Sequence, residues 1–299
     1  MDIAITGSSG LIGTALRVTM MAAGHRVVRV VRSTSGTVAG DSIRWDPSAG
    51  SIDGAGLEGI HAVVHLAGAG IGDHRWTAAY KRELRESRLL GTGLMARTLA
   101  GLRRPPAVLV SASGVDYYGD RGDEELTETS TPGASFLADL CQAWEAATGP
   151  AEAAGIRVAH LRNGIVLARQ APALRRQLPL FKIGLGGRFG SGRQWQSWIH
   201  IDDEIAAIRH LIDGDHRGPA NLTAPNPVRN RDFAKTLGRV LRRPSVVPVP
   251  RFGPRLVVGR ELADTLLFES KRVLPAALLG SGFTFTQPEL EGALRDLLR

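Results

Sequence analysis

Residues 1–13 read MDIAITGSSGLIG, and this stretch decides the fold. Residues 2–6 form a short apolar run with β-branched side chains, which is typical of a buried strand. Glycines follow at positions 7, 10 and 13, and residues 11–23 carry apolar side chains at helical spacing. Between a strand and a helix, the first glycine permits a tight turn, the second lets the backbone approach a pyrophosphate, and the third allows the helix to pack closely.

The glycine spacing, G-x-x-G-x-x-G, therefore predicts a dinucleotide-binding turn with the phosphates at the helix N-terminus. A turn that merely joins a strand to a helix is the alternative. The residues expected to hold the cofactor in this turn are Gly7, Ser9, Gly10, Leu11, Ile12 and Gly13.

The next apolar run, residues 26–32, ends in Arg32 and indicates which dinucleotide is bound. Units of this kind that bind NAD place an acidic residue about 20 residues after the glycines, where it binds the ribose 2′-hydroxyl. Between Ile3 and Gly40 this chain has no Asp or Glu. A guanidinium at Arg32 suits a 2′-phosphate instead, so the sequence favours NADP(H). The alternative is that Arg32 only solvates the end of the strand.

Strand and helix patterns alternate through the first half of the chain, which predicts an α/β fold with a doubly wound parallel sheet. In such sheets, ligands bind at the carboxyl ends of the strands. After about residue 168 the alternation weakens. The expected strands are residues 2–6, 26–32, 42–46, 60–66, 107–111 and 156–161, and the expected helices are residues 11–23, 76–102 and 134–154.

Composition limits the cellular setting. The single cysteine, Cys141, excludes an intrachain disulfide and fits a reducing compartment. The sequence shows no signal-peptide pattern and no window of eighteen apolar residues. We therefore expect a cytoplasmic protein that does not bind a membrane.

The formal net charge is +8, and much of it is local. Residues 153–201 contain eight Lys and Arg residues and no Asp or Glu. A local basic segment in an otherwise mixed chain predicts a pocket for a small anionic ligand such as a phosphate. A solvated basic face is the alternative. No nucleic-acid-binding motif accompanies the charge, so we expect no nucleic-acid partner.

Several motifs together resemble those of an extended short-chain dehydrogenase/reductase. More specifically, they resemble the "epimerase family protein" group of atypical members, which carries a C-terminal segment of unknown function. The first motifs are residues 6–13 (TGSSGLIG), 65–68 (HLAG) and Ser113. The more specific ones are ESR at 86–88, YYGD at 117–120, FLA at 136–138, WE at 144–145, GSGRQ at 190–194, SWIH at 197–200, VLP at 273–275, GFTF at 282–285 and PEL at 288–290.

The resemblance implies an NADP(H)-binding Rossmann domain over residues 1–168. Residues 169–299 would form a smaller α/β substrate cap, with some segments returning to the Rossmann domain. It also implies cofactor contacts beyond the glycine turn, from the small residues after the 60–66 strand and from the long helix that follows; a surface ion pair on that helix is the alternative. The further cofactor residues are Leu66, Ala67, Gly68, Glu83, Arg88 and Arg162.

One departure from the wider family concerns catalysis. Extended members carry Tyr-x-x-x-Lys on the helix after the active-site Ser, where Tyr is the acid–base group and Lys lowers its pKa. The two alignment registers of this chain place Leu137 and Cys141, or Phe136 and Leu140, at those positions. No Lys occurs between Lys81 and Lys182, so the dyad is absent.

Hydride transfer to or from a carbinol still needs a proton partner. Tyr117 and Tyr118 follow Ser113 closely and are the candidates for this role, with His200 as a third. Ser113 would donate to a substrate oxygen or to the nicotinamide amide. The alternatives are that Ser113 caps the strand end and that the tyrosines pack the loop.

The cap side of the cleft is expected to bind the substrate. Here the alternatives are core packing for each tryptophan and a bond to the start of the next helix for His200. No metal site is predicted. The candidate substrate-binding residues are Arg193, Trp195, Trp198 and His200.

Two functions remain open. The first is an NADP(H)-binding oxidoreductase or nucleotide-sugar epimerase-like enzyme that acts on a small anionic or sugar-like substrate. The second is an NADP(H)-binding regulatory or redox-sensing module with little catalysis, which the missing dyad favours. The oligomeric state is left open.

Overall fold

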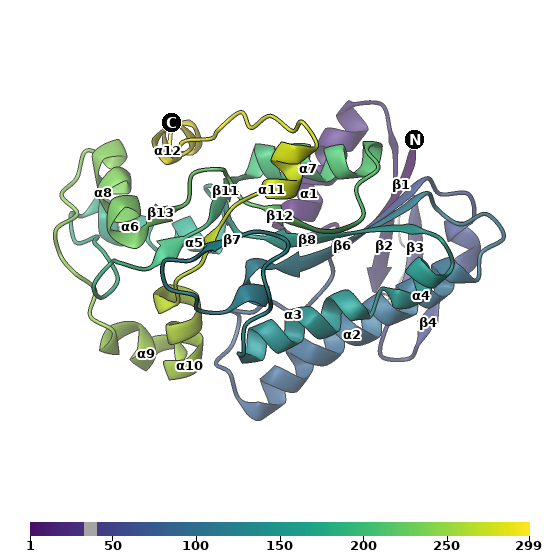
Figure 1. Cartoon of the computed structure of the whole chain (residues 1–299), viewed down its shortest axis with the longest axis horizontal. Helices are drawn as coiled ribbons and strands as arrows, with labels where there is room; N and C mark the ends of the chain where they lie inside the picture. The colour runs from purple at the N-terminus through teal and green to yellow at the C-terminus, as the bar shows by residue number, and fades with distance from the viewer. Residues whose placement is uncertain (33–40) are drawn as a thin grey trace.

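An eight-stranded sheet forms the centre of the protein in the computed structural model, which describes residues 1–32 and 41–299 (Figure 1). The strand order is β12-β8-β6-β5-β1-β2-β3-β4, and every neighbouring pair is parallel except β3 with β4. The strands are β1 (Asp2–Thr6), β2 (Arg26–Arg32), β3 (Ser42–Asp46), β4 (Ser51–Ile52), β5 (Ala62–His65), β6 (Val108–Gly114), β8 (Arg157–Asn163) and β12 (Gly218–Leu222).

Helices cover both faces of this sheet (Figure 1). On one face lie α1 (Leu11–Ala22) and α7 (Ile201–Asp213), and on the other lie α2 (Ala78–Ala100), α3 (Phe136–Ala146) and α4 (Gly149–Ala153). Alternate residues of β1 enter two cores: Ile3 and Ile5 pack in one, and Ala4 packs in the other. The predicted Rossmann-type doubly wound parallel sheet is confirmed.

The helix expected over residues 134–154 is divided into α3 and α4, with a break at Ala147 and Thr148. Pro150 stands in the first turn of α4. A proline has no N–H to donate and is tolerated in a first turn but not inside a helix, which explains the break.

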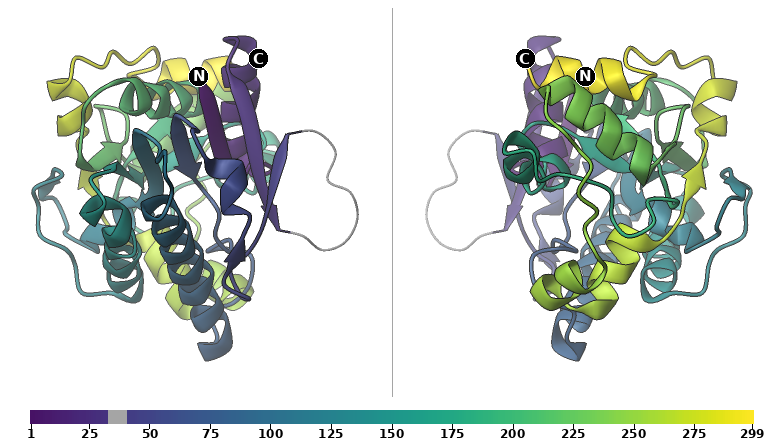
Figure 2. Two further views of the ribbon diagram at one scale, coloured as in Figure 1. Left: turned by 90° about the vertical axis from the view of Figure 1, so that its right-hand side faces the viewer. Right: turned by 90° about the vertical axis from the view of Figure 1, so that its left-hand side faces the viewer.

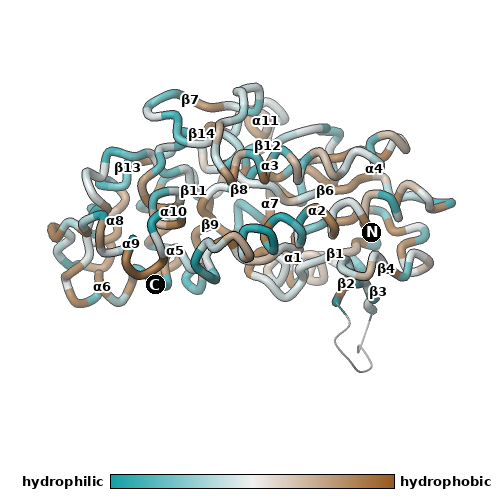
Figure 3. Tube along the Cα trace, turned by 90° about the horizontal axis from the view of Figure 1, so that it is seen from below, coloured by the Kyte–Doolittle hydropathy of each residue, from teal (hydrophilic) through white to brown (hydrophobic). Residues whose placement is uncertain are grey.

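The second half of the chain adds a smaller part at the end of the molecule opposite β2–β4 (Figure 3). Two segments after residue 168 return to the large sheet, because β12 is its edge strand and α7 packs against α1 and β6. The short strands form three pairs: β7 (Glu125–Leu126) with β14 (Arg272–Val273), β9 (Ile165–Leu167) with β11 (Trp198–His200), and β10 (Trp195–Gln196) with β13 (Val228–Arg229).

The smaller part has its own core, in which Trp198, Phe233, Leu237 and Leu294 pack together. Helix α12 lies beside α8 there (Figure 2). Within the described residues, no helix combines the length and apolar character needed to cross a membrane. The remaining helices are α5 (Pro172–Arg175), α6 (Leu178–Lys182), α8 (Asn230–Leu241), α9 (Phe252–Val258), α10 (Arg260–Ala263), α11 (Ala276–Gly280), α12 (Leu290–Leu297), the single-turn helices η1 (Gly54–Leu57) and η2 (Val115–Tyr118), and the π-helical turn η3 (Asp264–Phe268).

Candidate functional site

The glycine turn between β1 and α1 leaves no room for a side chain at position 7 or position 13. Gly7 has a φ of +63°, and a Cβ there would lie 2.9 Å from the carbonyl carbon of Leu66. A Cβ on Gly13 would lie 2.2 Å from the carbonyl oxygen of Gly7. The N–H of Gly10 donates to that same oxygen at 2.9 Å. Glycine is therefore required at positions 7 and 13 by close backbone approach.

The N-terminus of α1 is left without a side-chain partner. Its N-cap residue is Gly10, no side chain caps it, and its first turn contains no acidic residue. The N-terminus of a helix carries partial positive charge and unpaired N–H groups, so this arrangement suits a phosphate. Ser9 and Gly10 are exposed at this turn, and Leu11 and Ile12 are half-buried.

The end of β5 lies directly beside the glycine turn. The hydroxyl oxygen of Thr6 accepts the N–H groups of Leu66 and Ala67 at 3.0 and 3.1 Å. Beyond them, a Cβ on Gly68 would lie 3.4 Å from the Arg88 side chain. The structure thus brings the predicted residues of the 66–68 segment next to Gly7, and Arg88 next to Gly68.

Arg88 and Glu83 lie on different sides of α2. Arg88 is 5% exposed, its Nη1 donates to the carbonyl of Leu84 at 3.1 Å, and its guanidinium lies 4.7 Å from the Trp144 ring. Burial lowers the pKa of Arg88. Its Nε has no hydrogen-bond partner among the described residues, so one buried donor stays free. Glu83 is exposed.

Arg32 lies at the exposed carboxyl end of β2. The parallel pairing of β1 with β2 ends at Thr6 and Val30, so Arg32 extends beyond β1 on the side of the glycine turn. This is the position at which the sequence predicted a group for the 2′-phosphate.

Ser113, Tyr118 and Arg162 meet in one buried hydrogen-bond network around Glu145. The Ser113 hydroxyl donates to Oε1 of Glu145 at 2.7 Å, and Arg162 binds both oxygens of Glu145 at 2.9 Å. Arg162 also donates to the Tyr118 oxygen at 2.9 Å, and the Tyr118 hydroxyl donates to Oδ1 of Asn221 at 2.7 Å. These polar groups are already paired with one another.

Tyr118, one of the predicted proton-exchanging residues, lies inside this network. Tyr118 is 0% exposed, and burial raises its pKa to about 12. Arg162 is 3% exposed, and its guanidinium nitrogens donate to Glu145 and Tyr118. Tyr117 is half-buried, with its ring centroid 3.5 Å from Cζ of Arg162.

Trp198 and His200, two of the predicted substrate-binding residues, are buried and line neither of the two pockets described below. Trp198 is 0% exposed and donates its indole N–H to the carbonyl of Asn226 at 3.2 Å. His200 is 1% exposed, and its Nδ1 accepts the backbone N–H of Asp202 at 3.1 Å. His200 is thus the N-cap of α7, the alternative left open by its position before a predicted helix.

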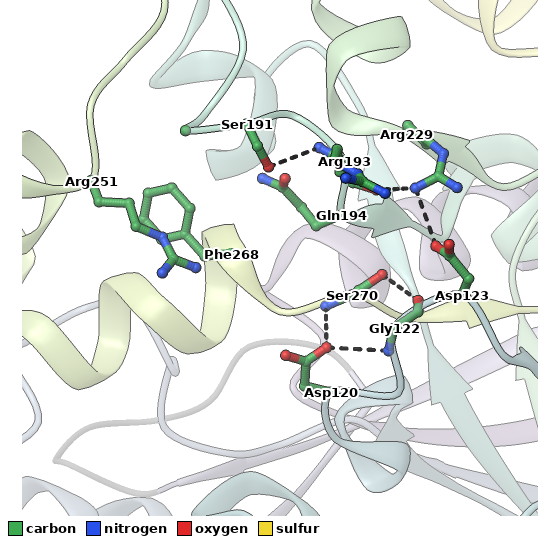
Figure 4. A pocket seen from close by; sticks show the side chains of 11 residues that line it. Asp120, Gly122, Asp123, Ser191, Arg193, Gln194, Arg229, Arg251, Phe268 and Ser270 are labelled. Carbon is green, nitrogen blue, oxygen red and sulfur yellow. Dashed lines mark hydrogen bonds and ion pairs between the residues drawn. The ribbon is translucent and has the colours of Figure 1, made fainter.

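The structure contains a pocket of about 560 Å³, here called the arginine pocket (Figure 4). Asp123 lies 3.1 Å from Arg229 in an ion pair, and the guanidinium of Arg251 lies 4.7 Å from the Phe268 ring. Arg193, a predicted substrate-binding residue, is exposed in it. The lining residues are Asp120, Gly122, Asp123, Gly190, Ser191, Arg193, Gln194, Arg229, Arg251, Phe268 and Ser270.

A smaller pocket of about 210 Å³, here called the strand-end pocket, lies at the carboxyl ends of β6 and β8. It includes the predicted Trp195, whose indole N–H donates to Asp123 at 2.9 Å. Ser113, Tyr117 and Tyr118 are not among its lining residues. These are Val115, Asp116, Asn163, Gly164, Ile165, Trp195, Gln196, Ser197, Thr265, Leu266, Leu267, Glu269 and Lys271.

Three ionisable side chains meet in the strand-end pocket and are here called the ion trio. Nζ of Lys271 lies 3.0 Å from Oδ1 of Asp116 and 2.7 Å from Oε2 of Glu269. The side chains of Lys271, Asp116 and Glu269 are 10%, 19% and 18% exposed. Burial opposes the Lys271 charge, but the two carboxylates outweigh it, so the pKa of Lys271 is raised; burial also raises the pKa of Glu269.

The ion trio was missed from the sequence because its members are far apart in the chain. Asp116 directly follows β6, whereas Glu269 and Lys271 lie just before β14, which pairs with β7. The only available signal was the VLP motif at 273–275, two residues beyond Lys271. That motif indicated a family but no chemistry.

The positions of the missing dyad lie on α3, where three of the four are buried and Phe136 is half-buried. Leu137, Leu140 and Cys141 are at most 5% exposed, and burial raises the pKa of Cys141 to about 12. No phenol or amine enters the site from either alignment register.

Comparison with known proteins identifies the family of this chain. The NAD dependent epimerase/dehydratase family model matches residues 3–223. The chain belongs to this family. A second family model, a domain of unknown function (DUF1731), matches residues 249–297 of this epimerase-family chain. The matched segment contains Glu269 and Lys271.

Relatives match the chain over nearly its whole length. Epimerase family protein Mb2239 of Mycobacterium bovis is 41% identical over 98% of this chain and 96% of its own length. The crystal structure of human epimerase family protein SDR39U1 with NADPH is 34% identical, with a TM-score of 0.90 over 99% of both chains. A nucleoside-diphosphate sugar epimerase of Corynebacterium glutamicum is 37% identical, with a TM-score of 0.77 over 99% of this chain and 58% of that one.

Proposed function

We propose that this chain is an NADP(H)-dependent oxidoreductase or epimerase-like enzyme that acts on a small anionic or sugar-like substrate. One observation carries the proposal: the glycine turn after β1 and the ion trio after β6 lie at the same edge of one parallel sheet. Doubly wound sheets bind their ligands at this edge, so a dinucleotide on the turn would extend toward the trio.

The residues of the crevice fit the cofactor. The turn has the close backbone packing that a pyrophosphate needs, and Arg88 keeps a buried donor without a partner. Arg32 would bind the 2′-phosphate, and the human relative crystallised with NADPH supports this choice. When bound, NADP(H) supplies or accepts a hydride. Gly7 to Gly13 would hold its phosphates, and Leu66 to Gly68 would let its ribose approach the backbone.

The arginine pocket supports an anionic substrate. Arg193, Arg229 and Arg251 line it, and Asp123 pairs with Arg229. A guanidinium binds phosphate or carboxylate through paired N–H groups. The Corynebacterium relative, named as a nucleoside-diphosphate sugar epimerase, supports a phosphate-bearing substrate. Trp195, which lines the strand-end pocket and donates to Asp123 of the arginine pocket, would contact this substrate.

Purified protein tests the proposal in two stages. NADPH and NADH binding are measured by calorimetry, and we expect NADPH to bind more tightly. The NADPH complex is then incubated with panels of carbonyl compounds and nucleotide sugars, following both NADPH oxidation and sugar products. Turnover with an anionic member of a panel is expected. Absence of NADPH binding would overturn the proposal.

The regulatory alternative rests on the missing dyad and has its own outcome. A pure NADP(H)-binding module would bind NADPH tightly, leave it reduced with every compound, and yield no sugar epimer. The expected cytoplasmic location, the anionic small-molecule substrate and the expectation of no nucleic-acid partner remain predictions.

A further inference from the structure

The absent Tyr–Lys dyad leaves the proposed reaction without a proton donor. The predicted tyrosines do not fill this gap, because Tyr118 is fully buried in a hydrogen-bond network and Tyr117 does not line the strand-end pocket. All three members of the ion trio line that pocket. The pocket lies at the carboxyl ends of β6 and β8, the edge at which doubly wound sheets bind their ligands.

The charges of the ion trio favour one bound proton. One ammonium and two carboxylates would give a net negative charge if all were ionised, and burial makes such a charge costly. The carboxyl group that faces the most opposition to ionisation is Glu269: burial raises its pKa, Asp116 and Asp120 raise it further, and Lys271 only partly offsets them. Lys271 remains an ammonium between the two carboxyl groups.

The hydrogen bonds of the ion trio also single out Glu269. Oε2 of Glu269 lies 2.7 Å from Lys271 but lacks a well-aligned hydrogen bond within the described residues. Nζ of Lys271 donates a hydrogen bond to the carbonyl oxygen of Thr265 at 3.5 Å and lies within ion-pair distance of Asp116 and Glu269. Among the buried polar side-chain atoms of the trio, Oε2 of Glu269 is the one left without a hydrogen bond within the described residues, so Glu269 is the member that can turn a polar atom toward a substrate.

We propose that Glu269 is the proton donor and acceptor of this site, with Lys271 and Asp116 as positioning residues. This inference rests on the proposed function. In the reductive direction, a hydride from NADPH forms the new C–H bond at a carbonyl carbon, and the carbonyl oxygen takes the proton of Glu269. The products are the alcohol, NADP⁺ and the Glu269 carboxylate, which the Lys271 ammonium stabilises.

The first test needs no substrate. Carboxyl groups of ¹³C-Glu-labelled protein are titrated by NMR without cofactor, comparing wild type with Glu269→Gln and with Lys271→Met. We expect one glutamate signal that titrates above the ordinary value of about 4.3 to vanish in E269Q and to move to higher pH in K271M. Because Glu204 is also buried and titrates high, the spectra are repeated in a Glu204→Gln background. A Glu269 signal with an ordinary pKa would overturn the inference.

The second test uses any carbonyl substrate found for the wild type. We expect E269Q to lower kcat at least a hundredfold with little change in KM, and Glu269→Asp to restore part of it. Glu125→Gln breaks the neighbouring ion pair with Arg272 on β14 without touching the pocket, and Lys235→Met removes an exposed amine; both should keep full turnover. Full turnover in E269Q would refute Glu269 as the proton donor and would leave the proposed function intact.

The two proposals fail separately. If NADPH binds and no substrate is found, the NMR titration still decides whether Glu269 carries a proton. If E269Q or K271M does not fold, Asp116→Asn takes its place, because Asp116 raises the pKa of Glu269 and its removal should lower it. An unchanged pKa of Glu269 in D116N would contradict the electrostatic interaction between Asp116 and Glu269 in the ion trio.

Discussion

Arg162 and Glu145 form a paired, buried ion pair, with Nε to Oε1 and Nη2 to Oε2 both at 2.9 Å. Their side chains are 4% and 12% exposed. Glu145 also accepts the Ser113 hydroxyl, so the pair joins α3 to β8 and β6. Ser113 is thereby fixed to a carboxylate of α3.

Removing Arg162 should destabilise the protein strongly. Arg162→Met leaves the Glu145 carboxylate buried without its cation and Tyr118 without a donor. Breaking one side of a buried ion pair typically costs roughly 3–5 kcal/mol. We expect a loss of this size in the free energy of unfolding, measured by urea titration.

Arg209→Met is the matched control for this measurement. Arg209 and Asp213 form an exposed pair on α7, with a 3.4 Å contact and exposed fractions of 49% and 44%. Exposed pairs contribute about 0–1 kcal/mol. Equal losses in the two variants would show that the buried pair has no special role in stability.

The stability of the protein should fall when Tyr118 loses its hydroxyl group and should not change when Tyr117 loses its own. Tyr118→Phe leaves Asn221 and one N–H of Arg162 without a partner, which costs about 1–3 kcal/mol of stability. Tyr117→Phe keeps the ring that stacks on Arg162 and should leave stability unchanged. Thermal unfolding of both variants measures the difference.

The same two variants also test the tyrosines as proton donors. Neither lines the strand-end pocket, so turnover per folded molecule should survive in both. A hundredfold loss of kcat in Y117F, with unchanged stability, would restore the tyrosine hypothesis and count against Glu269.

The first part of the fold was predictable because its determinants are local. Glycine at position 13 is required by contacts within the turn itself, and the glycine spacing is visible in the sequence. The alternation of strands and helices likewise depends on periodicity within each segment. These features predicted the parallel sheet and the glycine turn between its first strand and helix.

The ion trio and the burial of Trp198 and His200 were not predictable in the same way. Lys271 reaches Asp116 only because β14 pairs with β7, a long-range contact without a local signal. Tryptophan and histidine suit both a binding cleft and a core. Position alone favoured the cleft, and the packing around Trp198 placed it in the core.

Arg32 should select NADPH over NADH. Arg32 lies past the point where β2 pairs with β1, and its guanidinium would form charge-assisted hydrogen bonds with the 2′-phosphate, each contributing about 1.5–3 kcal/mol. Arg32→Ala is therefore expected to weaken NADPH binding roughly tenfold to a hundredfold and to leave NADH binding nearly unchanged. Calorimetric titration of both cofactors measures this.

Arg209→Ala serves as the charge-matched control, because this residue lies on α7 with an exposed side chain. It should leave both affinities unchanged. Equal weakening of NADPH and NADH in R32A would show that Arg32 does not recognise the 2′-phosphate.

Glu204 on α7 should make stability fall as pH rises. It is 0% exposed, neither carboxyl oxygen has a partner among the described residues, and burial raises its pKa to about 8 from an ordinary 4.5. Because the folded state holds the proton more tightly, its stability contribution is complete below pH 4.5 and is lost as pH rises through about 8.

Glu204→Gln keeps the size of the side chain and removes the titration. Each pKa unit corresponds to about 1.4 kcal/mol, so E204Q should unfold at nearly the same urea concentration as wild type at pH 4.5 and gain a few kcal/mol at pH 9. The exposed Glu86→Gln should follow the wild type at both pH values. If E204Q also follows the wild type at pH 9, the Glu204 carboxylate has a counter-charge or water in solution that compensates for its burial.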